Sequence, residues 1–449
     1  MSKQFDLAIK NIHLIDPVND IDRVADIYIK DGRIAEIQFD NTIIATDCAS
    51  DFYDACADKV IDATGLMAGP GLVDVHVHFR DPGQTHKEDI HTGSLAAAAG
   101  GYTSVVLMAN TVPAVDNEDT LSYVLEKADK EKINIYSCAT VTQGMRGEKT
   151  VDFDGLYKAG AVGFTDDGKP IMNEELLREA FLRAKELDVP VSLHEEDPSF
   201  ISENGINAEI APNFNKLQKE SGEGSGNLKG SPRDAEISLI RRDIKIADDT
   251  KVSLNVQHIS TKEGVELIRN IRKTNENIHA EATPHHFSLT QEDVLQFKTF
   301  AKMNPPLRTK EDKEAIIKGL CDGTIDIIAT DHAPHSTSEK SQEFAKAPSG
   351  IIGLETAFAL ACTNLYKPGY LNMKELFCKM SVNPARLYHL NAGSLGVGDS
   401  ADLVIFDPNE EWIVRDFKSK SSNSPFVNKK LTGKVKYTVC RGEVIYEDK

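Results

Sequence analysis

The chain has 449 residues, of which 40% are hydrophobic and 27% charged, and its formal net charge at pH 7 is −19. This length and composition predict a globular protein with more than one domain, and the negative charge argues against nucleic acid or an anionic membrane as a partner. The chain contains no run of 18 apolar residues, and its first residues lack the apolar stretch of a signal peptide. The seven cysteines form no CxxC pair, so we expect free thiols and a cytoplasmic location.

Short strands are expected at both ends of the chain. At the N-terminal end they span 5–15 and 27–37, with Asp31-Gly32 as a hairpin turn, and at the C-terminal end they span 401–406 and 435–446, with Arg441-Gly442 as a turn. Because both ends are rich in β-structure and the middle is different, we predict one small β-sandwich domain built from residues 1–66 and 391–449.

The middle of the chain, residues 67–390, alternates apolar runs with helical patterns. The runs span 72–77, 103–108, 133–139, 161–164, 189–193, 252–256, 278–282 and 325–329, and the helical patterns span 118–130, 174–186, 234–247, 262–273 and 310–321. Eight such units predict an α/β fold, a (β/α)₈ TIM barrel. A doubly wound open sheet is the alternative, but no GxGxxG motif follows any run.

Two long connections follow predicted strands of this barrel. Residues 195–233 contain the segment SGEGSG at 221–226, and residues 335–349 are mostly polar. Both are expected to be flexible. Both also leave the C-terminal ends of strands, which is the face where barrel enzymes carry their active sites.

Residues that can bind a metal follow the predicted strands almost at once. His76 and His78 are two residues apart on a strand and therefore point to the same face. A single histidine at a strand end is more often structural, but here the whole set recurs at one place in the fold: His76, His78, Asp166 or Asp167, His194, His258 and Asp331. Four imidazoles and two carboxylates suit zinc, and six ligands exceed one tetrahedral ion, so we predict two metals.

The neighbouring residues divide into further candidates and structural groups. Arg80 directly follows the HxH pair and can hold an anionic substrate beside the metals. Alternation along the strand allows only one of Asp166 and Asp167 to face them. We expect His285 and His286 to be structural or to support the ligands, and His332 to point away from the metals.

Five segments carry a resemblance to a known family. They are GLVDVHVHFRDPG at 71–83, MANT at 108–111, FTDDG at 164–168, MNPPLR at 303–308 and ATDHAPH at 329–335. Together they make the chain resemble the amidohydrolase superfamily and, within it, the bacterial class I type of the dihydroorotase family. The resemblance covers nearly the whole length.

The resemblance implies a role for each candidate. His76, His78 and Asp331 would hold one zinc ion and His194 and His258 the other, with Asp167 as the bridge and Asp331 as catalytic acid and base. Many cyclic amidohydrolases bridge with a carboxylated lysine, but Lys169 lies past the turn, which counts against a dihydropyrimidinase. The substrate-binding set implied is His78, Arg80, Asn110, Asn304, His335, Ser349 and Gly350, with Ser349 where phenylalanine is usual.

The implied reaction is the reversible, zinc-dependent cyclisation of N-carbamoyl-L-aspartate to dihydroorotate and water in pyrimidine biosynthesis. Allantoinase and dihydropyrimidinase act on neutral rings and do not need Arg80. A non-catalytic partner of aspartate transcarbamoylase would lack several metal ligands, whereas all six positions are filled here. Beyond the small substrate, the resemblance implies a homodimer or an association with aspartate transcarbamoylase, and no nucleic acid or membrane partner.

Overall fold

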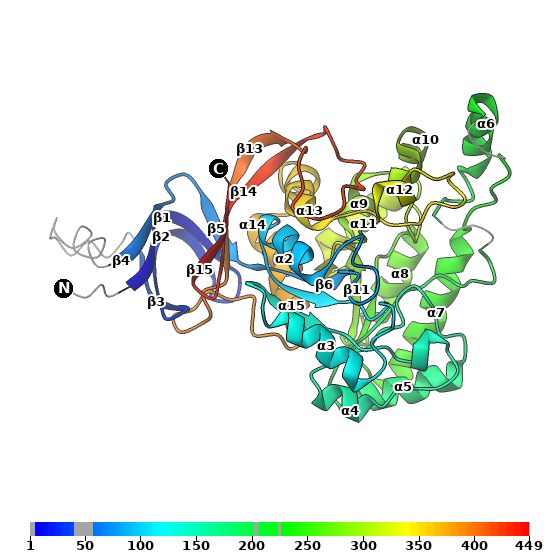
Figure 1. Cartoon of the computed structure of the whole chain (residues 1–449), viewed down its shortest axis with the longest axis horizontal. Helices are drawn as coiled ribbons and strands as arrows, with labels where there is room; N and C mark the ends of the chain where they lie inside the picture. Colours follow the sequence, from blue (N-terminus) through cyan, green and yellow to red (C-terminus); the bar gives the residue numbers. More distant parts are fainter. Residues whose placement is uncertain (1–4, 40–56, 202–204, 223–225, 449) are drawn as a thin grey trace.

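The computed structural model describes residues 5–39, 57–201, 205–222 and 226–448. A β-sheet built from both ends of the chain lies at one end of the molecule, and a larger body with helices on its outside lies at the other (Figure 1). Among the described residues, no helix is long and apolar enough to cross a membrane.

The larger body is built on a ring of parallel strands. Its strands are β6 (Leu72–Val77), β7 (Tyr102–Leu107), β8 (Asn134–Ser137), β9 (Val191–Leu193), β10 (Leu254–Val256), β11 (Ile278–Ala282) and β12 (Ile327–Ile328). They form two parallel sheets, β6-β7-β8 and β9-β10-β11-β12. Phe164 bridges Ala139 to Val191, and His332 pairs with Val77, so both gaps are closed. The predicted TIM barrel is confirmed.

The fourth barrel strand is shorter than the predicted 161–164. Only Phe164 makes bridge pairs, although the Ala139 N–H still donates to the Gly163 carbonyl and the Phe164 N–H to the Pro190 carbonyl. Pro190 has no N–H to return a hydrogen bond, so a regular ladder cannot form on that side. A run of apolar residues predicts a strand from its own side chains alone and does not show that the neighbouring strand lacks a donor.

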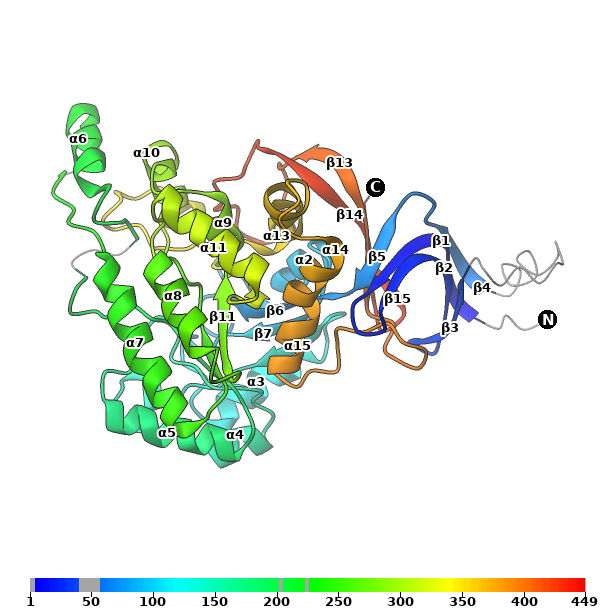
Figure 2. The ribbon, with the colours of Figure 1, turned by 180° about the vertical axis from the view of Figure 1, so that it is seen from behind.

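Helices cover the outside of the barrel, as Figure 2 shows from behind. They are α2 (Ile90–Ala99), α3 (Glu118–Ala128), α4 (Phe153–Lys158), α5 (Glu174–Glu186), α7 (Arg233–Thr250), α8 (Lys262–Ile271), α11 (Lys310–Asp322), α13 (Leu354–Ala361), α14 (Met373–Phe377) and α15 (Asn383–Leu387). The five predicted helices are present. Helix α5 has the predicted bounds because the Asn173 side chain accepts the Glu175 and Leu176 N–H groups and so fixes its start.

Further helices lie in the connections on the C-terminal side of the strands. They are α6 (Ala211–Ser221), α9 (Pro284–Ser288), α10 (Asp293–Phe297) and α12 (Thr337–Lys340). Helix α6 projects from the body of the molecule (Figure 1) and lies within the connection 195–233, which was expected to be flexible. Of the predicted mobile segment 221–226, residues 223–225 lie outside the described residues.

The sheet at the other end combines strands from both termini. These are β1 (Phe5–Asp16), β2 (Ile21–Lys30), β3 (Arg33–Phe39), β4 (Ala57–Asp62), β5 (Met67–Pro70), β13 (Leu403–Ile413), β14 (Lys430–Cys440) and β15 (Glu443–Glu447). Their order is β15-β14-β13-β5-β1-β2-β3, with β4 paired to β1. One buried cluster includes side chains from both terminal segments, such as Ile9, Ile27 and Ile405, so the sheet folds over its own core as a sandwich.

Both predicted hairpin turns are present. Asp31 and Gly32 have φ of 51° and 75°, and Arg441 and Gly442 have φ of 50° and 78°, which is the left-handed conformation that tight hairpins require. The turns pack on each other, since a Cβ on Gly442 would lie 2.9 Å from the Gly32 Cα. Strand β5 joins this sheet to β6 of the barrel, and the division into 1–66 with 391–449 and 67–390 stays a proposal.

Candidate metal centre

All six predicted metal ligands lie at the C-terminal ends of the barrel strands. His76 lies within β6 and His78 directly after it, and His194, His258 and Asp331 follow β9, β10 and β12. Asp167 follows the bridge at Phe164. Three of the site residues have a positive φ, which is 34° at His258, 48° at Asp331 and 59° at Arg80. Left-handed backbone at non-glycine residues is strained, and such strain gathers at functional sites.

The donor atoms of these side chains converge on one small volume. The His78 Nε2 lies 3.0 Å from the Asp331 Oδ1 and 3.5 Å from the Asp167 Oδ2, and the His76 Nε2 lies 3.6 Å from an oxygen of each aspartate. The His194 Nδ1 lies 3.0 Å from the His258 Nε2 and 3.9 Å from the Asp167 Oδ1. Two donor sets have atoms within 4.8 Å of one another, namely His76, His78 and Asp331, and His76, Asp167 and His258.

The arrangement of these donor atoms suits a bound divalent cation better than it suits hydrogen bonds among the side chains themselves. The His76 Nε2 is buried and has no hydrogen-bond partner among the described residues. Burial opposes ionisation of Asp167, but the charges of His76, His78 and His194 hold its pKa far below the usual range. Burial also opposes protonation of His76, yet the carboxylates of Glu281 and Asp167 raise its pKa. The negative charge of these carboxylates can thus be compensated either by protons on the imidazoles or by a metal ion.

Only one of the two adjacent aspartates faces the cluster, as alternation requires. Asp166 accepts hydrogen bonds from the Val141 N–H at 2.8 Å and the Thr142 N–H at 3.1 Å, and also from the Thr142 hydroxyl. Asp167 is therefore the bridging candidate. Lys169 is exposed and lies outside the donor cluster.

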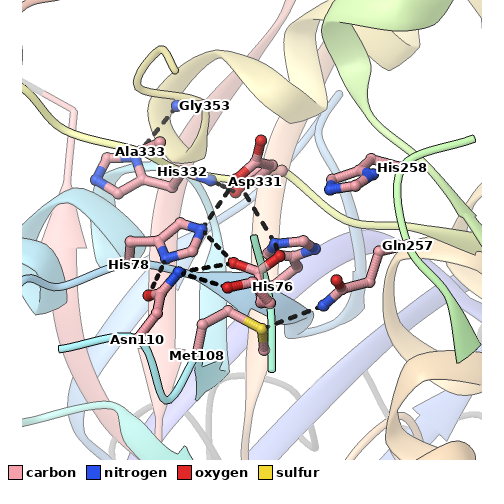
Figure 3. A network of polar contacts seen from close by, with 12 residues as sticks. His76, His78, Met108, Asn110, Gln257, His258, Asp331, His332, Ala333 and Gly353 are labelled. Atoms are coloured by element: carbon pink, nitrogen blue, oxygen red, sulfur yellow. Dashed lines mark hydrogen bonds and ion pairs between the residues drawn. The ribbon is translucent and has the colours of Figure 1, made fainter. Parts of the chain in front are cut away.

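A second group of side chains orients the imidazoles. The Asn110 Oδ1 lies 3.0 Å from the His78 Nδ1 (Figure 3). The Asn110 amide donates to the Asp167 Oδ2 at 2.9 Å. The His76 Nδ1 lies 2.9 Å from the Glu281 Oε2, and the His194 Nε2 lies 3.3 Å from the Glu196 Oε2. Each contact leaves the other ring nitrogen free to face the cluster, as in carboxylate–histidine–metal arrangements.

Glu196 and Glu281 were not among the site residues predicted from the sequence. Both are buried, at 3% and 0% exposure, and Glu281 lies in strand β11 between alanines. A carboxylate inside a buried strand is rare without a partner, and this was the signal that could have found it. The nearby histidines agree with expectation: the His332 Nδ1 accepts the Gly353 N–H, and His286 contacts the Pro305 carbonyl.

A cavity of about 320 Å³ opens beside the cluster, and it is lined by all seven predicted substrate-binding residues. The Arg80 Nε donates to the Pro334 carbonyl at 3.3 Å, and the remaining guanidinium lines the cavity near His335. Burial lowers the pKa of His335 to about 2, helped by the charges of Arg80 and Lys87. His335 is therefore neutral, and its Nε2 donates to the Ser349 carbonyl at 2.8 Å because its Nδ1 faces the Lys87 ammonium.

The cavity also holds an acceptor with free capacity. The Asn304 Oδ1 is buried and has no hydrogen-bond partner among the described residues, although Asn304 lines the cavity. An unpaired buried oxygen of this kind is costly unless a ligand satisfies it. The cavity therefore combines a guanidinium for a carboxylate, an acceptor for an N–H group and a cluster of metal donors.

The role of Glu196 can be tested by metal binding alone. Glu196→Gln is expected to raise the Kd for Zn²⁺ by about 10- to 100-fold, because the carboxylate no longer fixes and polarises the His194 ring. Competition with a chromophoric chelator measures this. Glu131→Gln is the matched control, since Glu131 makes a similar 3.1 Å contact with His91, which lies outside the cluster. Equal zinc affinity in both variants would contradict the role of Glu196.

The chain is similar to known proteins over almost its full length. The model of the amidohydrolase family matches residues 67–445. A dihydroorotase of Clostridioides difficile (strain 630) is 52% identical over 441 residues, which cover 98% of this chain and 99% of the relative, and a dihydroorotase of Clostridium acetobutylicum is 47% identical over 99% and 100%. Among solved structures, the L-hydantoinase (dihydropyrimidinase) from Arthrobacter aurescens has a TM-score of 0.82 at 28% identity and covers 99% of this chain and 96% of its own.

Proposed function

The chain belongs to the amidohydrolase family, and on this premise we propose that it is a dihydroorotase, a hydrolase acting on a cyclic amide in pyrimidine biosynthesis. It interconverts N-carbamoyl-L-aspartate with dihydroorotate and water. The observation that carries the proposal is that the Arg80 guanidinium lines the same cavity as the metal donors. A ring that bears a carboxylate needs both.

We propose two zinc ions, which fit the nitrogen-rich donor set. His76, His78 and Asp331 would hold one, His194 and His258 the other, and Asp167 would bridge them. When bound, these ions supply Lewis acidity, which lowers the pKa of water toward neutrality and polarises the amide carbonyl.

Substrate recognition follows from the lining of the cavity. The Arg80 guanidinium can pair the ring carboxylate through two parallel hydrogen bonds. His335 lies beside it at 3.4 Å from the Arg80 Nη2, and its neutral ring adds no competing charge. The Asn304 Oδ1 accepts the ring N–H, and the backbone at Ser349 and Gly350 completes the wall on this side.

Asp331 moves the proton of the reaction. In the hydrolytic direction it takes a proton from the attacking water as the new C–O bond forms, and it gives that proton to the ring nitrogen as the C–N bond breaks. Ring closure is the reverse, in which the ureido nitrogen attacks the carboxyl carbon and water leaves. Closure consumes one proton because a carboxylate becomes a neutral amide, so low pH favours the ring.

The rival function is that of the hydantoinases and dihydropyrimidinases, which share the fold. A neutral ring offers Arg80 no carboxylate, so the partly buried guanidinium would face the ring without an anionic partner. Burial lowers the pKa of Arg80, although the carboxylates of Asp331 and Asp167 oppose this. A carboxylate on the ring would likewise favour the charged guanidinium. On the basis of the resemblance, we propose a second copy of the chain or aspartate transcarbamoylase as a protein partner. We also propose a cytoplasmic location.

The proposal predicts that purified protein hydrolyses dihydroorotate, measured as the loss of its ultraviolet absorbance. A chelator should abolish the activity and Zn²⁺ should restore it, because the donors alone cannot activate water. Dihydrouracil, the same ring without the carboxylate, is the control substrate and should react far more slowly. Faster hydrolysis of dihydrouracil than of dihydroorotate would contradict the proposal and favour the rival.

A further inference from the structure

Two buried lysines hold the loop that carries Ser349 and Gly350. The Lys302 Nζ donates to the Phe344 and Ala347 carbonyls, both at 2.6 Å. The Lys340 Nζ donates to the Pro348 carbonyl at 2.9 Å and to the Gly350 carbonyl at 3.0 Å. The two lysine side chains thus bind four carbonyl oxygens within seven residues of one loop.

Both lysines are almost fully inside the protein. Lys302 is 4% exposed and Lys340 is 1% exposed. The charge of a buried lysine is costly unless its donors are satisfied, and here backbone carbonyls accept the hydrogen bonds that the structure shows for both. Hydrogen bonds from a charged donor are about twice as strong as neutral ones, so the loop is tightly held.

The same loop forms one wall of the cavity. The Gly350 N–H donates to the Lys302 carbonyl at 2.9 Å, so the backbone of Lys302 holds the loop as well as its side chain. The Ser349 carbonyl accepts from His335, which lies beside Arg80. Gly350 has φ of 117°, and a Cβ there would lie 2.6 Å from the Ala333 Cβ, which leaves the loop little freedom to shift. Displacing the loop would therefore move Ser349, Gly350 and His335 together.

We propose that Lys302 and Lys340 are positioning residues, which hold the loop 341–350 so that its Ser349-Gly350 backbone and His335 face the substrate. This role rests on the proposed function, because it concerns the binding of the same substrate. The role concerns substrate binding and not metal binding, since both lysines contact the loop. Among the described residues, neither forms a hydrogen bond or an ion pair with the metal cluster.

The strength of these hydrogen bonds depends on the positive charge of the two lysine side chains. Burial lowers the pKa of Lys302 to about 8. Burial, with the charge of Lys302, lowers the pKa of Lys340 to about 7, and the adjacent Glu339 opposes this. A neutral amine donates weaker hydrogen bonds, so the loop is held most firmly when both groups are protonated.

The test is the variant Lys302→Met, with Lys340→Met as a second variant. Each should raise the KM for dihydroorotate about 10- to 100-fold, the effect of losing hydrogen bonds from a charged donor, while kcat and zinc content stay within about twofold. Trypsin should also cut faster after Lys346, whose side chain is exposed and whose neighbour Ala347 loses its lysine partner.

The matched control is Lys379→Met. Lys379 is also buried, at 7% exposure, and its Nζ donates to the Ile325 carbonyl at 3.0 Å, ahead of β12 and away from the cavity. This variant should keep the wild-type KM and the wild-type rate of cutting after Lys346.

Two results would overturn the proposal. One is an unchanged KM together with unchanged cutting after Lys346 in both lysine variants. The other is a parallel loss of kcat and zinc, which would mark a general structural role. If the wild-type protein does not hydrolyse dihydroorotate, the proposed function fails instead, while the rate of trypsin cutting still shows whether the lysines hold the loop.

Discussion

Replacing Asp331 with alanine is expected to lower kcat for dihydroorotate hydrolysis by about 10²- to 10⁴-fold, the range that general acid–base catalysis contributes. Asp331 lies 3.0 Å from His78, follows the last barrel strand in a strained conformation and lines the cavity. It thus contacts a metal donor and faces the cavity in which the proposed substrate would bind. Steady-state kinetics with circular dichroism, which checks the fold, measures this effect.

Asp331→Asn separates proton transfer from metal binding. Asparagine keeps the shape and one oxygen donor, but it cannot take a proton at neutral pH. We expect zinc content close to that of the wild type and a kcat almost as low as that of the alanine variant. Activity within tenfold of the wild type in Asp331→Asn would remove Asp331 as the proton carrier.

Arg80→Lys is expected to lower kcat/KM about 10- to 100-fold while zinc stays bound. A lysine keeps the positive charge but cannot reproduce the planar pair of hydrogen bonds to a carboxylate. The loss should be specific to the charged ring, so the preference for dihydroorotate over dihydrouracil should fall by a similar factor. Kinetics with both substrates and a zinc assay measure the two effects.

The control for this substitution is Arg178→Lys. Arg178 makes an exposed ion pair with Asp249 at 3.0 Å, and exposed pairs contribute little. Its kinetics should match those of the wild type within twofold. An Arg80→Lys variant that turned over dihydroorotate equally well would show that the carboxylate is bound elsewhere.

The sequence predicted the barrel because its strands are continuous apolar runs that a parallel sheet buries on both faces. Strand β6 has the predicted bounds, whereas the strand at 161–164 is reduced to Phe164 because Pro190 lacks an N–H. Helix α13 was missed because LETAFALA is apolar on nearly all sides and has no helical period. The local sequence pattern thus predicted the ring of barrel strands, but it could not show where a neighbouring strand shortens one of them.

The metal donors could be predicted for a related reason. The ends of parallel strands meet at one face, so a residue's place in the sequence also gives its place in the site. Glu281, Lys302 and Lys340 follow no such rule, because each acts through a partner that only the folded chain brings near. Lys302 and Lys340 look like surface residues in the sequence, and only burial shows that they bind carbonyl groups.

The acidic chain recognises an acidic substrate through local charge. Its net charge of −19 disfavours an anion, yet Arg80, Lys87, Lys302 and Lys340 surround the side of the cavity formed by His335 and the loop 341–350. Two metal ions would add four positive charges next to the four carboxylates of Asp167, Asp331, Glu196 and Glu281. Short distances and low solvent exposure make these local charges dominate over the distant surface field.

Anomalous X-ray scattering at the zinc absorption edge, from crystals of the zinc-loaded protein, tests the central claim most directly. The account predicts two peaks among His76, His78, Asp167, His194, His258 and Asp331, with Asp167 in contact with both. Zinc bound only at other residues, or no anomalous peak among these six in a protein that hydrolyses dihydroorotate, would contradict it.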